Sequence, residues 1–103
     1  MFLLLNEYAV DETTLATAHP AHVAWFVEQV DAGRVVMAGR QVPPVGGVII
    51  LHVATRAEAE SFAANDPYAL AGYATYRVIE FHAGVTRPEL LAPVDPPQSV
   101  ARG

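Results

Sequence analysis

The hydrophobic and polar positions of the chain change their spacing along residues 1–83, and these changes predict a β-α-β-β-α-β order of elements. An apolar run opens the chain and is closed by Asn6-Glu7, which suits a strand buried on both faces better than a helix. Apolar residues then recur at helical spacing after Pro20, and Gly33 follows as a helix stop. The predicted strands cover 2–8, 35–38, 48–53 and 73–83, and the predicted helices cover 20–32 and a segment from Thr55 to just before Pro67.

The two predicted helices differ in composition. The apolar stripe of the first helix, expected to face the core, consists of Val23, Phe26, Val27 and Val30. Trp25 is expected on the opposite side, as an oligomer contact or beneath the C-terminal tail. The second helix is rich in alanine and begins with Thr55 followed by Glu58, which is the pattern of a capping box. Residues 9–18 are expected to form a polar connector.

This order of elements is that of the ferredoxin-like α+β fold, an antiparallel sheet with two helices on one face. The other face of such a sheet would meet water, where alternation should place polar residues. The last strand does alternate, but the strands at 2–8 and 48–53 are apolar on both faces. We therefore expect a homodimer in which a second copy covers that face, either sheet against sheet or as a shared α/β barrel.

Composition favours association and argues against several classes of function. Of the 103 residues, 52% are apolar and 17% are charged, against about 25% charged in an average domain. Acidic residues outnumber basic ones by 11 to 6, and the net charge of −5 argues against binding to nucleic acid or to an anionic membrane. The absence of cysteine excludes a disulfide and a thiolate metal site. The N-terminal apolar run is too short to cross a bilayer, so a cytoplasmic protein is expected.

The chain is expected to divide into one domain and a tail. Residues 1–84 contain all the predicted elements and form the expected domain. Residues 85–103 hold four prolines and show little periodicity. They are expected to form a C-terminal tail that is flexible or lies over a partner.

His22 and Asp66 are the side chains with the clearest chemical potential. His22 lies in the opening turn of the first helix, and Asp66 ends the second helix directly before Pro67. Two crossover helices of one sheet can bring these ends together in space. Histidine changes its charge near neutral pH, and a neighbouring carboxylate fixes its tautomer and stabilises the charged form. Each residue also has a structural interpretation, because His22 could bond a backbone carbonyl and Asp66 could simply initiate a turn.

Other side chains are candidates for binding a ligand. His19 and His22 are spaced so that they could share a metal, but no third ligand is evident, and neither a metal nor another cofactor is predicted. Arg34 and Arg40 flank the second strand, and either could hold an anionic substrate or be solvated surface. The Tyr68 hydroxyl could orient a ligand, or its ring could pack the corner between helix and strand.

Several short segments, taken in their order and spacing, resemble the YCII-related (YciI-like) family over about residues 1–83. These segments are HPAH at 19–22, AGR at 32–34, AG at 38–39, DPY at 66–68 and AGY at 71–73. The resemblance implies a dimeric α+β barrel of ferredoxin-like subunits, and it implies that His22 and Asp66 carry the family's His–Asp pair. Two departures are visible. The arginine that often precedes the family's proline is His19 here, and the loop at 40–47 is short, which would leave the pocket mouth more open.

Relatives in this family are linked to dehydrochlorination of a chlorinated hydroxyquinol and resemble muconolactone isomerases in fold. The first hypothesis is therefore a cofactor-independent enzyme in which His22 takes or gives a proton and Asp66 orients the imidazole. His19, Arg34 or Tyr68 would hold a small cyclic or aromatic substrate for isomerisation, HX elimination or lactone chemistry. The alternative is a non-catalytic small-molecule-binding or accessory dimer, in which the pair stabilises a cleft or senses pH.

Overall fold

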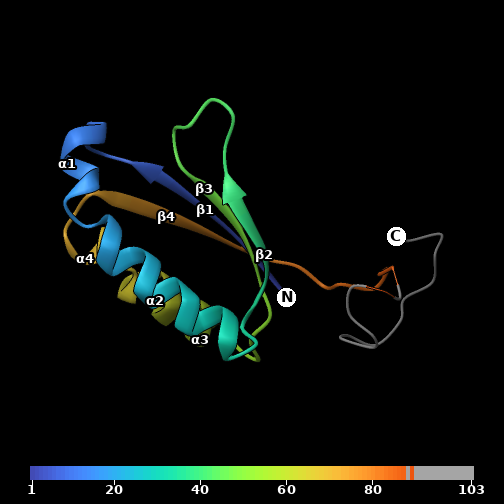
Figure 1. The fold of residues 1–103 in the computed structure, drawn as a ribbon. Coiled ribbons are helices and arrows are strands. Elements are labelled where there is room, and N and C mark those ends of the chain that lie inside the picture. Colours follow the sequence, from blue (N-terminus) through green and yellow to red (C-terminus); the bar gives the residue numbers. More distant parts are fainter. Residues whose placement is uncertain (88, 90–103) are drawn as a thin grey trace.

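The computed structural model describes residues 1–87 and residue 89 of the chain, and its elements follow the order β-α-α-β-β-α-α-β (Figure 1). The elements are β1 (Phe2–Tyr8), α1 (Glu12–Ala16), α2 (His19–Asp31), β2 (Val35–Arg40), β3 (Gly47–Leu51), α3 (Arg56–Asn65), α4 (Pro67–Leu70) and β4 (Ala74–Glu80). Within these residues the strands form one sheet in the order β2-β3-β1-β4, with every neighbouring pair antiparallel. The predicted ferredoxin-like α+β fold is confirmed, with two short helices added to it.

The central strand β1 shows why one face of the sheet carries the core. Phe2 and Leu4 are buried, whereas the intervening Leu3 and Leu5 are only half-buried. Successive side chains of a strand point to opposite faces, so the even-numbered positions face the helices. Figure 1 shows α2 and α3 on the same side of the sheet. The core cluster consists of Phe2, Leu4, Ile49, Leu51, Ala59, Phe62 and Ala63.

The opposite face of the sheet is apolar at its centre. Leu3 pairs with Ile50, and Leu5 pairs with Val48, across the antiparallel β1–β3 ladder. All four side chains are half-buried. The homodimer predicted to cover this face stays a prediction.

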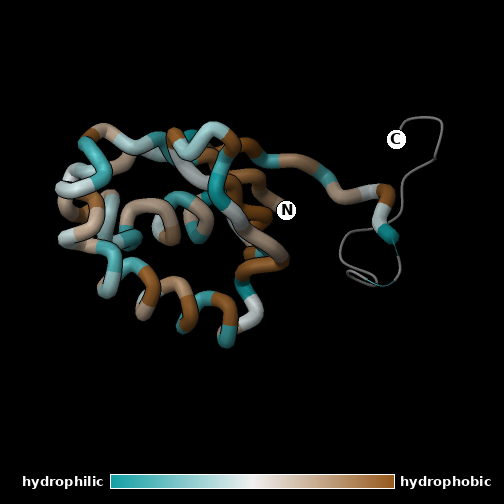
Figure 2. Tube along the Cα trace, turned by 45° about the horizontal axis from the view of Figure 1, so that its top comes forward, coloured by the Kyte–Doolittle hydropathy of each residue, from teal (hydrophilic) through white to brown (hydrophobic). Residues whose placement is uncertain are grey.

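The helix α2 is turned about its axis relative to the prediction: of the predicted stripe only Phe26 packs against the core, and it does so together with Trp25, which was expected on the opposite side. Val23, Val27 and Val30 are 44%, 51% and 47% exposed, whereas Trp25 and Phe26 are half-buried against the core. Figure 2 shows hydrophobic residues recurring along this helix. Either the valines or the aromatic rings of α2 could face the sheet. The aromatic rings do so, because they bury more apolar area than the valines would. The alanine-rich helix α3 leaves room for these rings, and Trp25 packs on Phe62 with ring centroids 4.7 Å apart.

The predicted connector at residues 9–18 is not irregular, because it contains the short helix α1. Asp11 caps this helix by accepting a hydrogen bond from the Thr14 amide at 2.8 Å. Leu15 is buried beside Tyr68 and Ala74 in a second small apolar cluster. A single buried leucine in a polar segment has no periodicity, so the spacing of apolar residues could not reveal this helix.

The boundaries of α3 follow the predicted signals. The Thr55 hydroxyl accepts a hydrogen bond from the Glu58 amide at 3.2 Å, as expected of a capping box. The Glu58 carboxylate accepts from the Ala54 amide, also at 3.2 Å. The helix ends at Asn65, since the residue before Pro67 is disfavoured in helical conformation. Pro67 then starts α4, which was not predicted.

The C-terminal part of the chain is described only in part. The predicted tail covers residues 85–103, of which residues 88 and 90–103 lie outside the described residues. In the part of the chain that is described, no helix is both long and apolar enough to cross a membrane.

Candidate active site

His22 and Asp66 are in direct contact. The Nδ1 atom of His22 lies 2.7 Å from Oδ1 of Asp66, although 44 positions separate the two residues. His22 lies in the first full turn of α2, where its amide donates to the Ala18 carbonyl at 3.0 Å. Asp66 lies at the junction of α3 and α4. The His22 side chain is 19% exposed and the Asp66 side chain is fully buried, so the pair has one side toward solvent and one toward the interior.

The Asp66 carboxylate accepts hydrogen bonds at both oxygens. Oδ1 accepts from the Tyr68 amide at 2.9 Å as the N-terminal cap of α4, and Oδ2 accepts from the Tyr76 hydroxyl at 2.6 Å. Burial raises the pKa of Tyr76, and the Asp66 charge raises it further, so the hydroxyl keeps the proton that it donates. With these partners and His22, the buried carboxylate meets the requirement that buried charges be hydrogen-bonded.

This arrangement determines which nitrogen of His22 is basic. Because Asp66 accepts, Nδ1 carries the hydrogen and Nε2 of a neutral imidazole keeps its lone pair. Among residues 1–87 no hydrogen-bond partner for Nε2 is present. The Tyr68 ring stacks on the His22 ring with centroids 4.0 Å apart and planes 8° from parallel, which holds the imidazole in one orientation. A carboxylate, an oriented imidazole and an open Nε2 form an arrangement that can transfer a proton.

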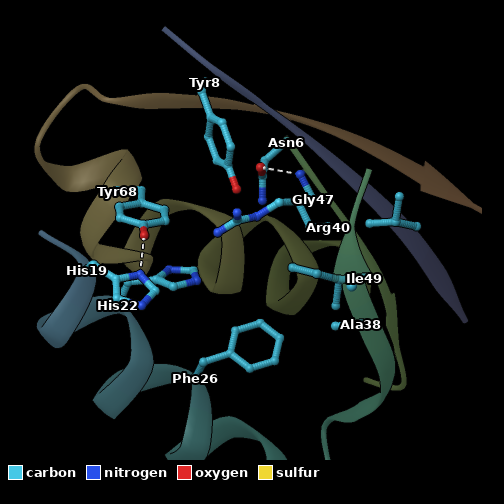
Figure 3. Close-up of a pocket in the computed structure, with 12 residues that line it drawn as sticks. Asn6, Tyr8, His19, His22, Phe26, Ala38, Arg40, Gly47, Ile49 and Tyr68 are labelled. Atoms are coloured by element: carbon cyan, nitrogen blue, oxygen red, sulfur yellow. Dashed lines mark hydrogen bonds between the residues drawn. The ribbon is translucent and has the colours of Figure 1, made fainter. Parts of the chain in front are cut away.

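A cavity of about 240 Å³ adjoins His22, between α2 and the helix-covered face of β1, β2 and β3 (Figure 3). Its walls combine aliphatic and aromatic groups with a few polar ones, as small-molecule sites do. The lining residues are Asn6, Tyr8, His19, His22, Phe26, Ala38, Gly39, Arg40, Gly47, Val48, Ile49 and Tyr68.

The predicted site residues do not all meet at this cavity. His19, His22 and Tyr68 line it, and Asp66 lies behind His22. His19 Nδ1 lies 2.8 Å from the Tyr68 hydroxyl. Burial raises the pKa of Tyr68, with further raising by Tyr8 and Asp66 and an opposing effect of Arg40, so its hydroxyl stays protonated at neutral pH.

Arg34 lies elsewhere. Its Nη1 donates to the Gln29 side chain at 3.1 Å, and it lines a separate hollow with Trp25 and Glu58. The distance follows from helix geometry, because α2 has 13 residues and spans about 20 Å at 1.5 Å per residue. His22 lies near the start of α2, whereas Arg34 follows its end.

Two polar lining residues, Asn6 and Tyr8, were not considered as site residues from the sequence. Asn6 and Tyr8 continue the inward-facing positions of β1 after Leu4, and that change from apolar to polar on one face was the available signal. Asn6 is buried, and its side-chain oxygen accepts from the Gly47 amide at 2.7 Å. Arg40 ends β2 at the cavity, and it was one of the two arginines that the sequence analysis considered as holders of an anionic substrate.

The side chains of the described residues do not suggest a metal centre. No group of three or more His, Cys, Asp or Glu side chains in that part of the chain could hold a metal ion.

Comparison with known proteins places this geometry in context. The YCII-related domain matches residues 1–82. Among solved structures, the chain is similar to 5-chloro-2-hydroxyhydroquinone dehydrochlorinase (TftG) from Burkholderia phenoliruptrix AC1100 in complex with 2,5-dihydroxybenzoquinone. The TM-score is 0.65 at 19% sequence identity, over 81% of this chain and 96% of that chain. Comparison with curated proteins gives no match. The structural likeness supports the fold, and because the domain match spans most of the sequence, the chain belongs to the YCII-related family.

Proposed function

We propose that this protein is an enzyme that moves a proton on a small cyclic or aromatic compound, with His22 as the general acid and base. The observation that carries the proposal is the 2.7 Å contact between His22 Nδ1 and the buried Asp66 carboxylate, beside a cavity that the histidine lines. General acid–base catalysis by a positioned histidine contributes about 100- to 10,000-fold to a rate.

The proposed step begins with Nε2 of His22 taking a proton from a ring carbon or hydroxyl of the substrate. The electron pair left behind enters the ring. In an elimination from a hydroxylated aromatic ring, the imidazolium returns this proton to the carbon that bears the halide. A second hydroxyl proton is then taken, its electron pair moves through the ring, and the halide leaves with its bonding pair, so that HX is lost overall. In an isomerisation, the imidazolium returns the proton to another ring atom. Asp66 stabilises the imidazolium in both cases, and His19 and Tyr68 are proposed to hold the substrate.

The size of the cavity supports a ligand with a single ring. A cavity of about 150 Å³ can bind benzene, and the cavity here is about 240 Å³, which leaves room for a few substituents. The structurally similar TftG is named for a dehydrochlorinase activity on a chlorinated hydroxyhydroquinone. Elimination of HX from a hydroxylated ring is therefore the first reaction to examine.

The test is chloride release from 5-chloro-2-hydroxyhydroquinone, with proton–deuterium exchange into enolisable cyclic ketones and lactones as a second readout. The native protein should catalyse at least one of these reactions, and His22→Gln should lower the rate by about 100- to 10,000-fold. Arg34→Gln is the matched control, since Arg34 lies outside the cavity. Undiminished catalysis in His22→Gln would contradict the assignment. No catalysis by the native protein would favour the non-catalytic binding protein.

A cytoplasmic location remains a prediction from the sequence.

We also propose that the protein works as a homodimer. The proposed interface is the sheet face around Leu3, Leu5 and Ile50, whose side chains are half-buried in the single chain. Light scattering after gel filtration should give twice the mass of the chain, and Ile50→Lys should give the mass of one copy. Val27→Lys, on the exposed side of α2, should leave the mass unchanged. A native protein with the mass of a single chain would contradict the dimer.

A further inference from the structure

We propose that Arg40 is the residue that selects the ligand of this cavity, by binding an anionic oxygen carried on the ligand ring. The inference rests on the proposed function in so far as the same cavity receives the substrate. It adds the substrate class, which is a ring compound with an ionised carboxylate, phenol or enol, and a specificity-determining residue.

The charge of the cavity wall differs from that of the whole chain. The chain carries a net charge of −5, with 11 acidic residues. Nevertheless, no aspartate or glutamate of the described residues lines the cavity, whereas Arg40 and two histidines do. Asp66 is fully buried behind His22 and already accepts three hydrogen bonds. Arg40 also borders a second hollow with Glu7 and Glu12, but among the described residues it forms an ion pair with neither. The cavity wall thus attracts an anion within an acidic protein.

Arg40 is also available for a ligand. Arg34 donates to the Gln29 side chain, and Arg56 bonds Glu60 at 3.0 Å and the Val78 carbonyl at 3.2 Å. By contrast, no hydrogen bond or ion pair of the Arg40 side chain occurs within residues 1–87. An arginine offers five N–H donors in a planar fork that matches a carboxylate or a pair of ring oxygens.

The backbone beneath Arg40 is tied to its neighbours. Arg40 pairs with Gly47 at the end of the β2–β3 ladder. The next residue, Gln41, bonds the Gly46 carbonyl through its amide at 2.8 Å and the Asn6 carbonyl through its side chain at 3.2 Å. A Cβ atom at Gly46 would lie 1.7 Å from the Asn6 carbonyl oxygen, so this close approach requires glycine. These contacts hold the base of the Arg40 side chain on the sheet, where sites are more precise than on free loops.

The positions of the two functional groups determine how a ligand would lie. Figure 3 shows the Arg40 side chain reaching into the cavity below the Tyr8 hydroxyl, with His22 and Tyr68 on the helix side. Phe26, Ala38 and Ile49 supply apolar wall for a ring. A ring placed there would direct its anionic oxygen to Arg40 and its reacting proton to Nε2 of His22. As the ring loses that proton, the charge that develops on its oxygen would be stabilised by the guanidinium.

The experiment measures binding, so it does not depend on knowing the substrate. Two probe pairs separate the possible sources of the anion. The first is 4-nitrophenolate against 4-nitroanisole, in which the ring oxygen is ionised or methylated. The second is 2,5-dihydroxybenzoate against 2,5-dihydroxybenzamide, in which a carboxylate is replaced by a neutral amide. Calorimetry at mildly alkaline pH keeps the phenolate and the carboxylate probes ionised, and an arginine side chain stays charged there.

The full chain should bind the anion of at least one pair about tenfold or more tightly than its neutral partner. Arg40→Gln should remove that preference with little effect on the neutral probe, and Arg40→Lys should retain part of it. Arg34→Gln should behave like the native protein. The proposal is overturned if neither pair shows a preference, if Arg40→Gln keeps it, or if Arg40→Gln weakens both probes equally. Because the readout is binding, failure here is distinct from failure of the His22→Gln turnover test.

Discussion

The helices α3 and α2 cover the same face of one sheet, but they meet it in different ways. Three residues of α3, namely Ala59, Phe62 and Ala63, are buried, whereas no residue of α2 is. The two alanines allow α3 to approach the sheet closely, since the distance between packed elements depends on side-chain size. At α2, Trp25 and Phe26 make the apolar contact while the turn that carries His22 borders a cavity. One half of the sheet is thus closely packed by α3, and the other half borders the cavity beside α2.

The largest expected effect is a loss of turnover when the negative charge of Asp66, beside the cavity, is removed. Asp66→Asn keeps the size of the side chain, and its amide oxygen can still accept from the Tyr68 amide and from His22. It loses the negative charge that stabilises the imidazolium, so turnover should fall by about 100- to 10,000-fold. Rates are to be compared with those of Arg34→Gln, with circular dichroism to verify folding. A folded Asp66→Asn protein with native turnover would contradict the role of the pair.

The next effect is on the packed half. Phe62 is 6% exposed and its ring packs on Trp25. Phe62→Ala removes the whole ring from the core and should lower the free energy of unfolding by about 3–5 kcal/mol. Urea denaturation followed by tryptophan fluorescence measures the change. A loss below about 1 kcal/mol would mean that α2 and α3 can collapse into the space, and that the packing beneath α3 is not tight.

A smaller effect on the free energy of unfolding is expected at the hydrogen bond between Tyr76 and Asp66, which lies between the packed half of the sheet and the cavity. Tyr76→Phe deprives Asp66 Oδ2 of its hydroxyl donor, which should cost about 1.5–3 kcal/mol, because a hydrogen bond to a buried charge is lost. Folding raises the pKa of Tyr76, so its contribution is present below the ordinary tyrosine value of about pH 10 and is lost as pH rises above it. The native protein should therefore lose more stability than Tyr76→Phe in alkaline urea titrations. Parallel pH curves for the two proteins would rule out this contribution.

The smallest effect concerns the outward side of α2. Val27 is 51% exposed, so Val27→Thr should change the free energy of unfolding by no more than about 0.5 kcal/mol. The same urea titration used for Phe62→Ala provides the comparison. A loss of several kcal/mol would mean that Val27 packs in the core, as the sequence analysis predicted.

The features predicted correctly from the sequence were those that depend on a few neighbouring residues. The β1 boundaries, the Thr55 cap and the stop before Pro67 were predicted as they occur, because each depends on neighbouring residues alone. The orientation of α2 was wrong, because two apolar stripes fit one helix and only the shape of α3 decides between them. The short helix α1 was missed since it buries only Leu15.

The difference between local signals and packing between elements also explains which parts of the candidate site could be predicted. The contact of His22 with Asp66 was foreseen from the matching ends of two crossover helices and from the family resemblance. Which arginine reaches the cavity depends on the length of α2 and on the end of β2, and no spacing of charged residues encodes that. Asn6 was hidden because a polar residue at the end of an apolar run also reads as the end of a strand. Its burial becomes visible only with the Gly47 contact.

Asp66 has a consequence for experiments that score many substitutions at once. Its carboxylate both contacts His22 and accepts a hydrogen bond from the Tyr68 amide in the first turn of α4. In a mutational scan read out by protein abundance, Asp66 should therefore tolerate few replacements and His22 more, because the Asp66 carboxylate keeps the Tyr68 and Tyr76 donors when His22 is replaced. Only a scan read out by activity should make the two positions equally intolerant. Ranking positions by abundance alone would place Asp66 among the scaffold residues and would rank His22 below it.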